Sequence, residues 1–378
     1  MAIEARRSRA RRFAACLIIF ASQFGLFELG LRTWGSSEAA PAFQGLFADD
    51  PAIGYRLKPD ARVHFATAEF DTEIAINSSG VRDDEEIGPK DKGKDERRIL
   101  LLGDSLVLAV QVPFRQTFGE LLERRLNAAQ SAYRYRVINA GVQGYGPVEE
   151  LLLLRRIVRD VQPDLVIETL FVGNDAEEAV TSLPRLTDER RASAGALRET
   201  AATRVRRLVR RSMVLQVLRL RIAAATDRFA WTAGPPEPPL QSYAAVAAPR
   251  IAQGLVVTRR VIDRMIIESA AAGARTAVVL MPARFQLDDA DYGRLRQAVS
   301  EAGGQLVRDG ATARFKEALA GINAPTFDPL PAMRAALPGP DLFFQQTVHL
   351  TPHGHEVVAE ALEGFLRDAR LLDAPPGR

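Results

Sequence analysis

Three apolar runs in the sequence stop at small and polar residues of the kind that react or bind. Residues 99–102 lead into Gly103-Asp104-Ser105, and "DLVIETLFV" (164–172) leads into Gly173-Asn174-Asp175. Between them, "YRVINA" (135–140) continues into the glycine-rich "GVQGYG". If these runs are parallel strands, their carboxyl ends meet at one edge of a sheet, which is where α/β proteins bind ligands. We therefore expect a single site at this edge.

A serine at such an edge can act as a nucleophile. Its hydroxyl reacts poorly until a base takes the proton, and the usual base is histidine, whose pKa lies near working pH. Attack on an ester carbonyl creates an oxyanion, which preorganised N–H donors stabilise. The glycine-rich backbone, the amide of Asn174 and the N–H of Ser105 itself are suitable donors. These residue types indicate acyl-transfer chemistry centred on Ser105.

The base must come from the C-terminal part of the chain, where most of the histidines lie. The four histidines are His64, His349, His353 and His355. Thr351 is a good helix N-cap and Pro352 suits a first helical turn, so a helix should begin there. His349 then stays in the preceding loop, again at the sheet edge. His353 and His355 fall in the first turn, facing solvent or behind the reacting groups, and His64 is expected on an exposed strand.

Four sequence blocks in this order resemble the SGNH/GDSL hydrolase family. They are "GDS", "NAGVQGYG", "GND" and the C-terminal "HLTPHGH". The segments "NSSGVRDDE" (77–85) and "MPARFQL" (281–287) further resemble its membrane-anchored bacterial branch. The resemblance spans roughly residues 49–370. It implies an α/β chain with a flavodoxin-like three-layer α/β/α fold, a parallel sheet, a serine hydrolase acting on ester bonds, and no cofactor.

The resemblance also implies a role for each site residue. Ser105 would be the nucleophile and His349 the general base. Gly144 and Asn174 would complete the oxyanion hole with the N–H of Ser105, and it is the family spacing that selects Gly144 over Gly141.

One position departs from the family pattern. The family usually has Asp three residues before the histidine, where it accepts a hydrogen bond from the imidazole, and here that residue is Gln346; the nearest upstream acid is Asp341. A neutral carbonyl can still fix the tautomer of the ring, although it stabilises the imidazolium less than a carboxylate does. We expect Gln346 or a backbone carbonyl to orient His349.

Structural, metal-binding and dinucleotide-binding interpretations of the same residues are weaker. Ser105 alone would be a turn or cap residue, and Asp104 is expected to hydrogen-bond within its own loop. The clustered histidines suggest a metal site, but only Glu356 adds a nearby acid and helical geometry separates the rings. Gly141, Gly144 and Gly146 are spaced GxxGxG, whereas the fingerprint of a dinucleotide-binding loop is GxGxxG, so a dinucleotide site is a weak interpretation.

Strand and helix patterns alternate through 97–182 and again through 245–372. Expected strands are 98–102, 135–140, 164–172, 275–282 and 324–330, and expected helices are 116–129, 148–161, 250–272, 303–320 and 352–367. Such alternation predicts a parallel sheet covered on both faces. We divide the chain into a basic tail and anchor helix (1–32), a tether and small β-rich segment (33–96), and a hydrolase domain (97–372) with a helical insertion at about 183–244.

The N-terminus has the pattern of a signal anchor. An arginine cluster at residues 6–12 precedes "FAACLIIFASQFGLF", which is free of charge from residue 13 to residue 27. With Glu28 at the far interface the segment reaches about the length a bilayer needs, and the arginines stay in the cytoplasm. We expect a single-pass bacterial inner-membrane protein with a periplasmic or extracellular catalytic domain. The alternatives are a cleaved signal peptide and a buried helix of a soluble protein.

The composition of the chain argues against several other kinds of protein and site. The net charge is +3 over 378 residues, which gives no electrostatic reason to expect a nucleic-acid partner. The single cysteine, Cys16, excludes an intrachain disulfide and a cysteine-based metal site. The arginine-rich segment 204–222 is expected to be a solvated helix face; the alternatives are contact with an anionic membrane or an acidic polymer.

Three functions follow from these residues. The leading one is a serine esterase that cleaves an acyl ester, acetyl being one candidate, from a small-molecule or cell-envelope carbohydrate substrate. The second is an O-acyltransferase that passes the same acyl group to a cell-surface polysaccharide. The third is a non-catalytic carbohydrate-binding relative, suggested by the missing aspartate, although Ser105, Asn174 and His349 are intact.

Restoring the acid at position 346 tests how His349 is oriented. We expect Gln346→Asp to leave ester hydrolysis equal or faster, because a carboxylate stabilises the imidazolium better than an amide does. The initial rate on a chromogenic ester measures this. Loss of activity in Gln346→Asp, together with normal activity in Asp341→Asn, would contradict the expectation.

Overall fold

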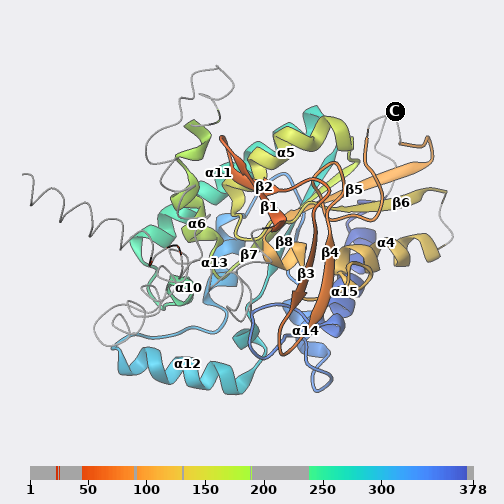
Figure 1. Cartoon of the computed structure of the whole chain (residues 1–378). Helices are drawn as coiled ribbons and strands as arrows, with labels where there is room; N and C mark the ends of the chain where they lie inside the picture. The colour runs from red at the N-terminus through yellow and green to blue at the C-terminus, as the bar shows by residue number, and fades with distance from the viewer. Residues whose placement is uncertain are drawn as a thin grey trace, which may run out of the picture. The chain divides into compact units, whose positions relative to one another are not determined.

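The computed structural model describes residues 23, 25, 45–88, 92–129, 132–187, 189 and 238–372. The described residues from 45 onward belong to one compact unit, drawn in Figure 1. Apart from residues 23 and 25, the predicted anchor at 1–32 lies outside the described residues, as do Cys16 and most of the predicted insertion, including 204–222. Of the described helices, none combines the length and apolar character that a membrane span needs.

A five-stranded sheet with the order β6-β5-β7-β8-β9 forms the core, and all its pairings are parallel. The strands are β5 (Glu96–Gly103), β6 (Arg134–Asn139), β7 (Leu165–Phe171), β8 (Arg275–Met281) and β9 (Thr326–Phe327). Numbered along the chain, the order is 2-1-3-4-5, which is a doubly wound arrangement. Every residue of β7 is buried, as its continuous apolar run predicts for a sheet covered on both faces. The predicted strands are therefore confirmed.

Helices cover both faces of the sheet, which makes a three-layer α/β fold (Figure 1). On one face α4 (Phe118–Ala128) packs against α15 (Pro352–Asp368). On the other face α5 (Pro147–Val161), α6 (Asp175–Ser182) and α11 (Pro249–Ala271) pack together. The chain runs outward from β5 to β6 through α4 and returns to β7 through α5. Right-handed crossovers, the rule for parallel strands, place these two helices on opposite faces.

The remaining helices are short or lie at the periphery. They are α3 (Ser105–Leu108), η2 (Phe114–Gln116), α10 (Pro238–Gln241), η3 (Arg284–Gln286), α12 (Asp289–Glu301), α13 (Gly310–Ala318) and α14 (Leu330–Ala335). The sequence patterns missed α12, and they predicted a longer helix where α13 lies. Only Asp291 and Val299 are buried on α12, so it lacks the apolar stripe that reveals a helix. Its N-cap Asp288 was the local signal available.

Two antiparallel hairpins precede the sheet. The first pairs β1 (Phe47–Asp50) with β2 (Gly54–Leu57), and the second pairs β3 (Arg62–Ala66) with β4 (Asp71–Ala75). We call β1–β2 and β3–β4 together the N-terminal hairpins.

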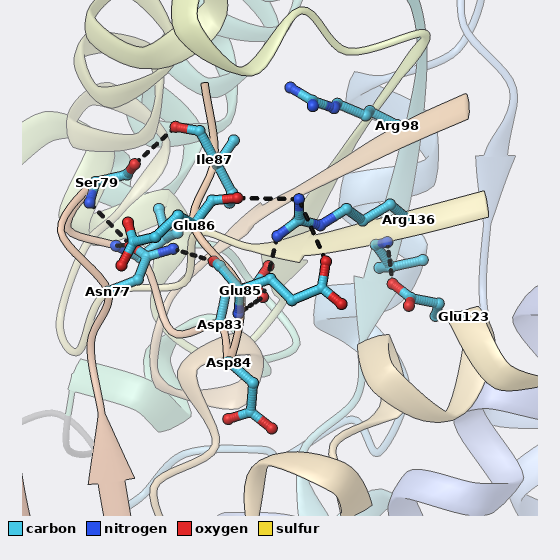
Figure 2. A network of polar contacts seen from close by, with 12 residues as sticks. Asn77, Ser79, Asp83, Asp84, Glu85, Glu86, Ile87, Arg98, Glu123 and Arg136 are labelled. Atoms are coloured by element: carbon cyan, nitrogen blue, oxygen red, sulfur yellow. Dashed lines mark hydrogen bonds and ion pairs between the residues drawn. The ribbon is translucent and has the colours of Figure 1, made fainter. Parts of the chain in front are cut away.

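The segment "NSSGVRDDE" that follows β4 folds onto itself (Figure 2). The Asn77 amide oxygen accepts N–H bonds from Ser79 and Val81, and its Nδ2 donates to the Glu85 carbonyl at 2.8 Å. Arg136 on β6 holds the far end of the segment by donating to the Glu86 carbonyl at 3.1 Å. Within this motif, Asn77 thus bonds the loop to itself and Asp83 pairs with Arg136 of the sheet.

That loop directs Arg82 into the interior. Arg82 is 1% exposed, and its guanidinium donates to the carbonyls of Leu108 at 2.6 Å, Ala109 at 2.5 Å and Val112 at 2.7 Å. Burial lowers its pKa to about 10, so it remains charged at neutral pH. Leu108 is the last residue of α3, and Ala109 and Val112 follow it. Arg82 therefore holds the chain in place where it leaves α3.

Replacing Arg82 with lysine should destabilise the fold. A lysine ammonium cannot reproduce the planar fork of donors, so we expect Arg82→Lys to lower the free energy of unfolding by about 2 to 3 kcal/mol. Urea denaturation of the full-length protein, followed by circular dichroism, measures this. Arg115→Lys is the matched control, because Arg115 is exposed and makes only a surface ion pair with Asp84. Equal losses in the two variants would contradict the expectation.

Candidate active site

The loop with the predicted nucleophile Ser105, residues 103–105, is called the nucleophile loop; it follows β5, which lies between β6 and β7. Gly103 has φ +157°, and a Cβ there would lie 2.4 Å from Val107 Cγ2, so only glycine fits. Asp104 caps α3 because its Oδ1 accepts the N–H of Leu106 at 2.8 Å, and the prediction that it holds its own loop is confirmed. Ser105, 9% exposed, is the first residue of α3.

The glycine-rich loop after β6 lies next to the nucleophile loop. Gly141 is buried, and a Cβ there would lie 2.3 Å from the backbone nitrogen of Leu108, so this glycine lets the loop pack on α3. Gly144 is exposed at φ +71°, and no described residue accepts its N–H. The two glycines therefore differ physically, and only Gly144 offers a free donor.

Asn174 follows β7 on the other side of the nucleophile loop. Its Nδ2 donates to Glu178 Oε1 at 2.9 Å, which uses one of the two amide hydrogens and leaves the other for a ligand. Glu178 also lies against the glycine-rich loop, because a Cβ on Gly146 would be 2.8 Å from the Glu178 Cβ. Glu178 therefore lies beside both Asn174 and the loop that carries Gly144. No sequence pattern indicated this position.

Buried carboxyl groups gather beneath these loops. Asp104, Glu150, Glu168 and Asp175 are each at most 4% exposed. Burial raises the pKa of Asp104 to about 6, of Glu168 to about 7 and of Glu178 to about 8, and it raises the pKa of Glu150 and Asp175 well above the usual range. Much of this cluster is therefore uncharged near neutral pH. The raised pKa values thus reduce the negative charge near Asn174, while Asp104 remains mostly ionised at neutral pH.

His349 lies in a short closed loop before α15. The Phe344 N–H donates to the His349 carbonyl at 2.9 Å, and a bridge pairs Phe343 with Leu350. We call residues 344–349 the His349 loop. The helix begins where the sequence predicts, because Thr351 Oγ1 accepts the N–H of Gly354 at 3.1 Å and caps α15.

The imidazole of His349 is enclosed by the protein. Both ring nitrogens are buried and, within the described chain, neither has a hydrogen-bond partner, so no bond to Ser105 is formed. Burial lowers the pKa of His349 to about 4, and the ring is therefore neutral at physiological pH, the form that can accept a proton. Hydrogen bonds between catalytic groups often form only when substrate is present.

The predicted contact between Gln346 and His349 is not made in this structure. Gln346 is exposed, and its backbone N–H donates to Glu69 Oε2 at 2.9 Å. Because the His349 loop closes between residues 344 and 349, Gln346 lies at its exposed turn, away from the ring nitrogens. Among the described residues no backbone carbonyl accepts from the ring either. Asp341 instead accepts from the side chain of Gln345 at 3.0 Å.

The other histidines have structural surroundings. His355, expected near solvent or behind the reacting groups, is 1% exposed; its Nδ1 accepts the N–H of Phe118 at 3.1 Å and joins α15 to α4. Burial, with smaller electrostatic contributions from Arg82 and His349, lowers its pKa to about 3. His64 is exposed, as expected, and pairs with Asp71. No group of residues suited to a metal ion occurs in the described ranges.

The N-terminal hairpins contact the loops that surround Ser105. The Tyr55 hydroxyl donates to the Gln143 carbonyl, next to Gly144, at 2.7 Å. Thr72 Oγ1 donates to the Val110 carbonyl in the chain that follows α3, at 2.6 Å. Glu69, in the turn between β3 and β4, accepts backbone N–H bonds from the His349 loop. Sequence patterns placed these hairpins before the domain but did not reveal these contacts.

Comparisons with known proteins return solved structures only. No protein-family model matches the chain, and no curated protein matches it. The esterase EstA from Pseudoalteromonas sp. is 15% identical, with 74% of this chain and 100% of that chain covered, at a TM-score of 0.38. A protein of the G-D-S-L family from Desulfitobacterium hafniense is 12% identical, covering 71% and 98%, at 0.35.

A third similar structure is the acetylxylan esterase Axe2 from Geobacillus stearothermophilus, 13% identical, covering 72% of this chain and 93% of that chain, at a TM-score of 0.35. One of these similar structures is named as a protein of the G-D-S-L family, the family that the sequence blocks resemble.

The burial of His349 predicts an unusual titration. We expect its ring protons, observed by NMR in histidine-labelled protein, to keep one chemical shift from pH 8 to pH 5 and to move only near pH 4, because burial disfavours the charged ring. The signal is assigned by its absence from His349→Gln. A midpoint near the ordinary value of about 6.5 would mean that the ring is solvated.

Proposed function

We propose that this protein is a serine hydrolase that cleaves an acyl ester through an acyl-Ser105 intermediate. The observation that carries the proposal is the strand order β6-β5-β7. It brings three groups onto adjacent loops at one edge of the sheet. They are the exposed N–H of Gly144, the hydroxyl of Ser105 at the start of α3, and the amide of Asn174, which uses one of its two hydrogens in the bond to Glu178. The neutral imidazole of His349 supplies the base that such a serine needs.

The proposed reaction has two balanced halves. Ser105 Oγ attacks the ester carbonyl carbon while His349 takes the hydroxyl proton, and the carbonyl oxygen becomes an oxyanion held by N–H groups of Ser105, Gly144 and Asn174. As the C–O bond to the alcohol breaks, the imidazolium returns the proton to the leaving alkoxide. Water then attacks the acyl-enzyme by the same route, with His349 as base, and releases the acid and free Ser105.

The substrate we propose is an acyl ester, with acetyl as the first candidate, on a cell-envelope carbohydrate. The support is the predicted N-terminal anchor, whose arginine cluster and apolar run would hold the catalytic domain outside the cytoplasm. We accordingly propose a single-pass inner-membrane protein with a periplasmic or extracellular domain.

O-acyl transfer to a polysaccharide is the second candidate. The observation that favours it is the missing acid partner of His349, since among the described residues neither ring nitrogen has a partner. A base without a carboxylate activates diffusing water poorly, whereas a sugar hydroxyl held in place reacts with a much higher effective concentration. The same acyl-Ser105 intermediate serves both reactions.

Labelling with a fluorophosphonate probe tests the nucleophile. We expect the full-length protein to be labelled and Ser105→Ala to remain unlabelled, because the probe reacts with an activated serine hydroxyl. Ser300→Ala is the matched control, since Ser300 is an exposed serine on α12. Acetylated sugars are then offered, with and without an acceptor sugar, and the products are separated by mass spectrometry.

Each result separates the candidate functions. Labelling with release of acetate supports the hydrolase, and faster transfer to the acceptor sugar than to water supports the transferase. An unlabelled wild-type protein that still binds the sugars would contradict both and favour a carbohydrate-binding protein.

A further inference from the structure

The His349 loop is held from outside by two oppositely charged side chains that the reaction scheme does not use. They are Glu69, in the turn of the second N-terminal hairpin, and Arg284, in η3 directly after β8. Both bind backbone groups at residues 344–346, the stretch that includes the position where the family usually carries its aspartate.

Glu69 binds two consecutive amides. Its Oε1 accepts the N–H of Gln345 at 2.7 Å, and its Oε2 accepts the N–H of Gln346 at 2.9 Å. Both distances are short, as expected for bonds to a charged acceptor, which are about twice as strong as bonds between neutral groups. The rings of Phe70 and Phe344, 5.6 Å apart, add an apolar contact beside them. The Glu69 carboxylate therefore binds the backbone of the His349 loop and not the side chain of Gln346.

Arg284 binds carbonyl groups of the same stretch, whereas Glu69 binds its amides. Its Nη1 donates to the carbonyl of Phe344 at 3.0 Å and also to the carbonyl of Gln345. Its Nη2 pairs with Asp291 on α12 at 2.5 Å, which fixes the guanidinium. Because η3 follows β8 after only two residues, this contact ties the loop to the central sheet.

The same hairpin also reaches the nucleophile side of the site. Thr72 on β4 donates to the carbonyl of Val110, and Arg82, a few residues later, holds the carbonyls of Leu108 and Ala109. One short antiparallel unit thus contacts both the chain that leaves α3 and the loop that carries His349. The second hairpin is therefore in contact with both parts of the site, through Thr72 and through Glu69.

We propose that Glu69 and Arg284 are positioning residues that align His349 with Ser105, taking over the orienting role that the absent aspartate leaves open. This inference rests on the proposed serine hydrolase function. The ring itself has no described partner, so the place of His349 depends on the loop that carries it. Besides the bond and bridge that close this loop, Glu69 and Arg284 hold its residues 344–346 from outside. A displacement of about 1 Å at a reacting group can cost about 100-fold in rate.

The test compares Glu69→Gln and Arg284→Lys with wild type in the full-length protein. Glu69→Gln removes the charge and one of the two acceptors, and we expect kcat on p-nitrophenyl acetate to fall by about tenfold with KM changed less than about twofold, because alignment and not substrate binding is lost. Glu73→Gln is the matched control. It removes the same charge from the same hairpin at an exposed position of β4.

Hydrogen exchange provides a readout that does not depend on activity. The amides of Gln345 and Gln346 should exchange more slowly in wild type and in Glu73→Gln than in Glu69→Gln. The double variant Glu69→Gln/Arg284→Lys should lose less activity than the product of the two single losses, because the two residues hold one loop.

The outcomes separate the two proposals. Ser105-dependent turnover that is unchanged in Glu69→Gln and Arg284→Lys would overturn the positioning role while leaving the hydrolase intact. A raised KM with unchanged kcat would overturn it as well. Wild-type protein without Ser105-dependent turnover or probe labelling would overturn the proposed function and, with it, this inference.

Discussion

Parallel pairing of β6, β5 and β7 is the constraint on which the rest of the structure depends. Parallel strands deliver their carboxyl ends to one edge, so pairing Leu101 with both Asn139 and Ile167 brings the three following loops side by side. Backbone hydrogen bonds between these largely buried strands hold this register, because slipping would leave buried polar groups unpaired. The loops can therefore be small and glycine-rich without losing their relative positions.

The site formed at this edge carries less charge than its ionisable groups would have in water. His349 is neutral because burial lowers its pKa, and much of the carboxyl cluster beneath Asn174 is neutral because burial raises the pKa of those groups. Both shifts have the same cause, which is that a charge without a partner is costly away from water. A low-polarity site of this kind strengthens the few N–H donors that remain for an oxyanion.

The N-terminal hairpins and the loop after them are part of the site's support. Tyr55 steadies the loop with Gly144, Arg82 and Thr72 hold the chain after α3, and Glu69 holds the His349 loop. Each contact joins a side chain to backbone carbonyls or amides. The hairpins therefore determine loop shape and leave the identity of the loop side chains free for chemistry.

The sequence alone determined the strands of the sheet, the cap at Thr351 and the bonding of Asp104 within its own loop, because such signals depend on neighbours a few residues apart. Only the tertiary structure decided that His355 is buried, that Gln346 does not reach His349, and that Glu69 binds a loop 276 residues away. Nothing in the sequence around Glu69 marks it, because its partners are backbone amides whose positions exist only once the sheet has brought distant segments together.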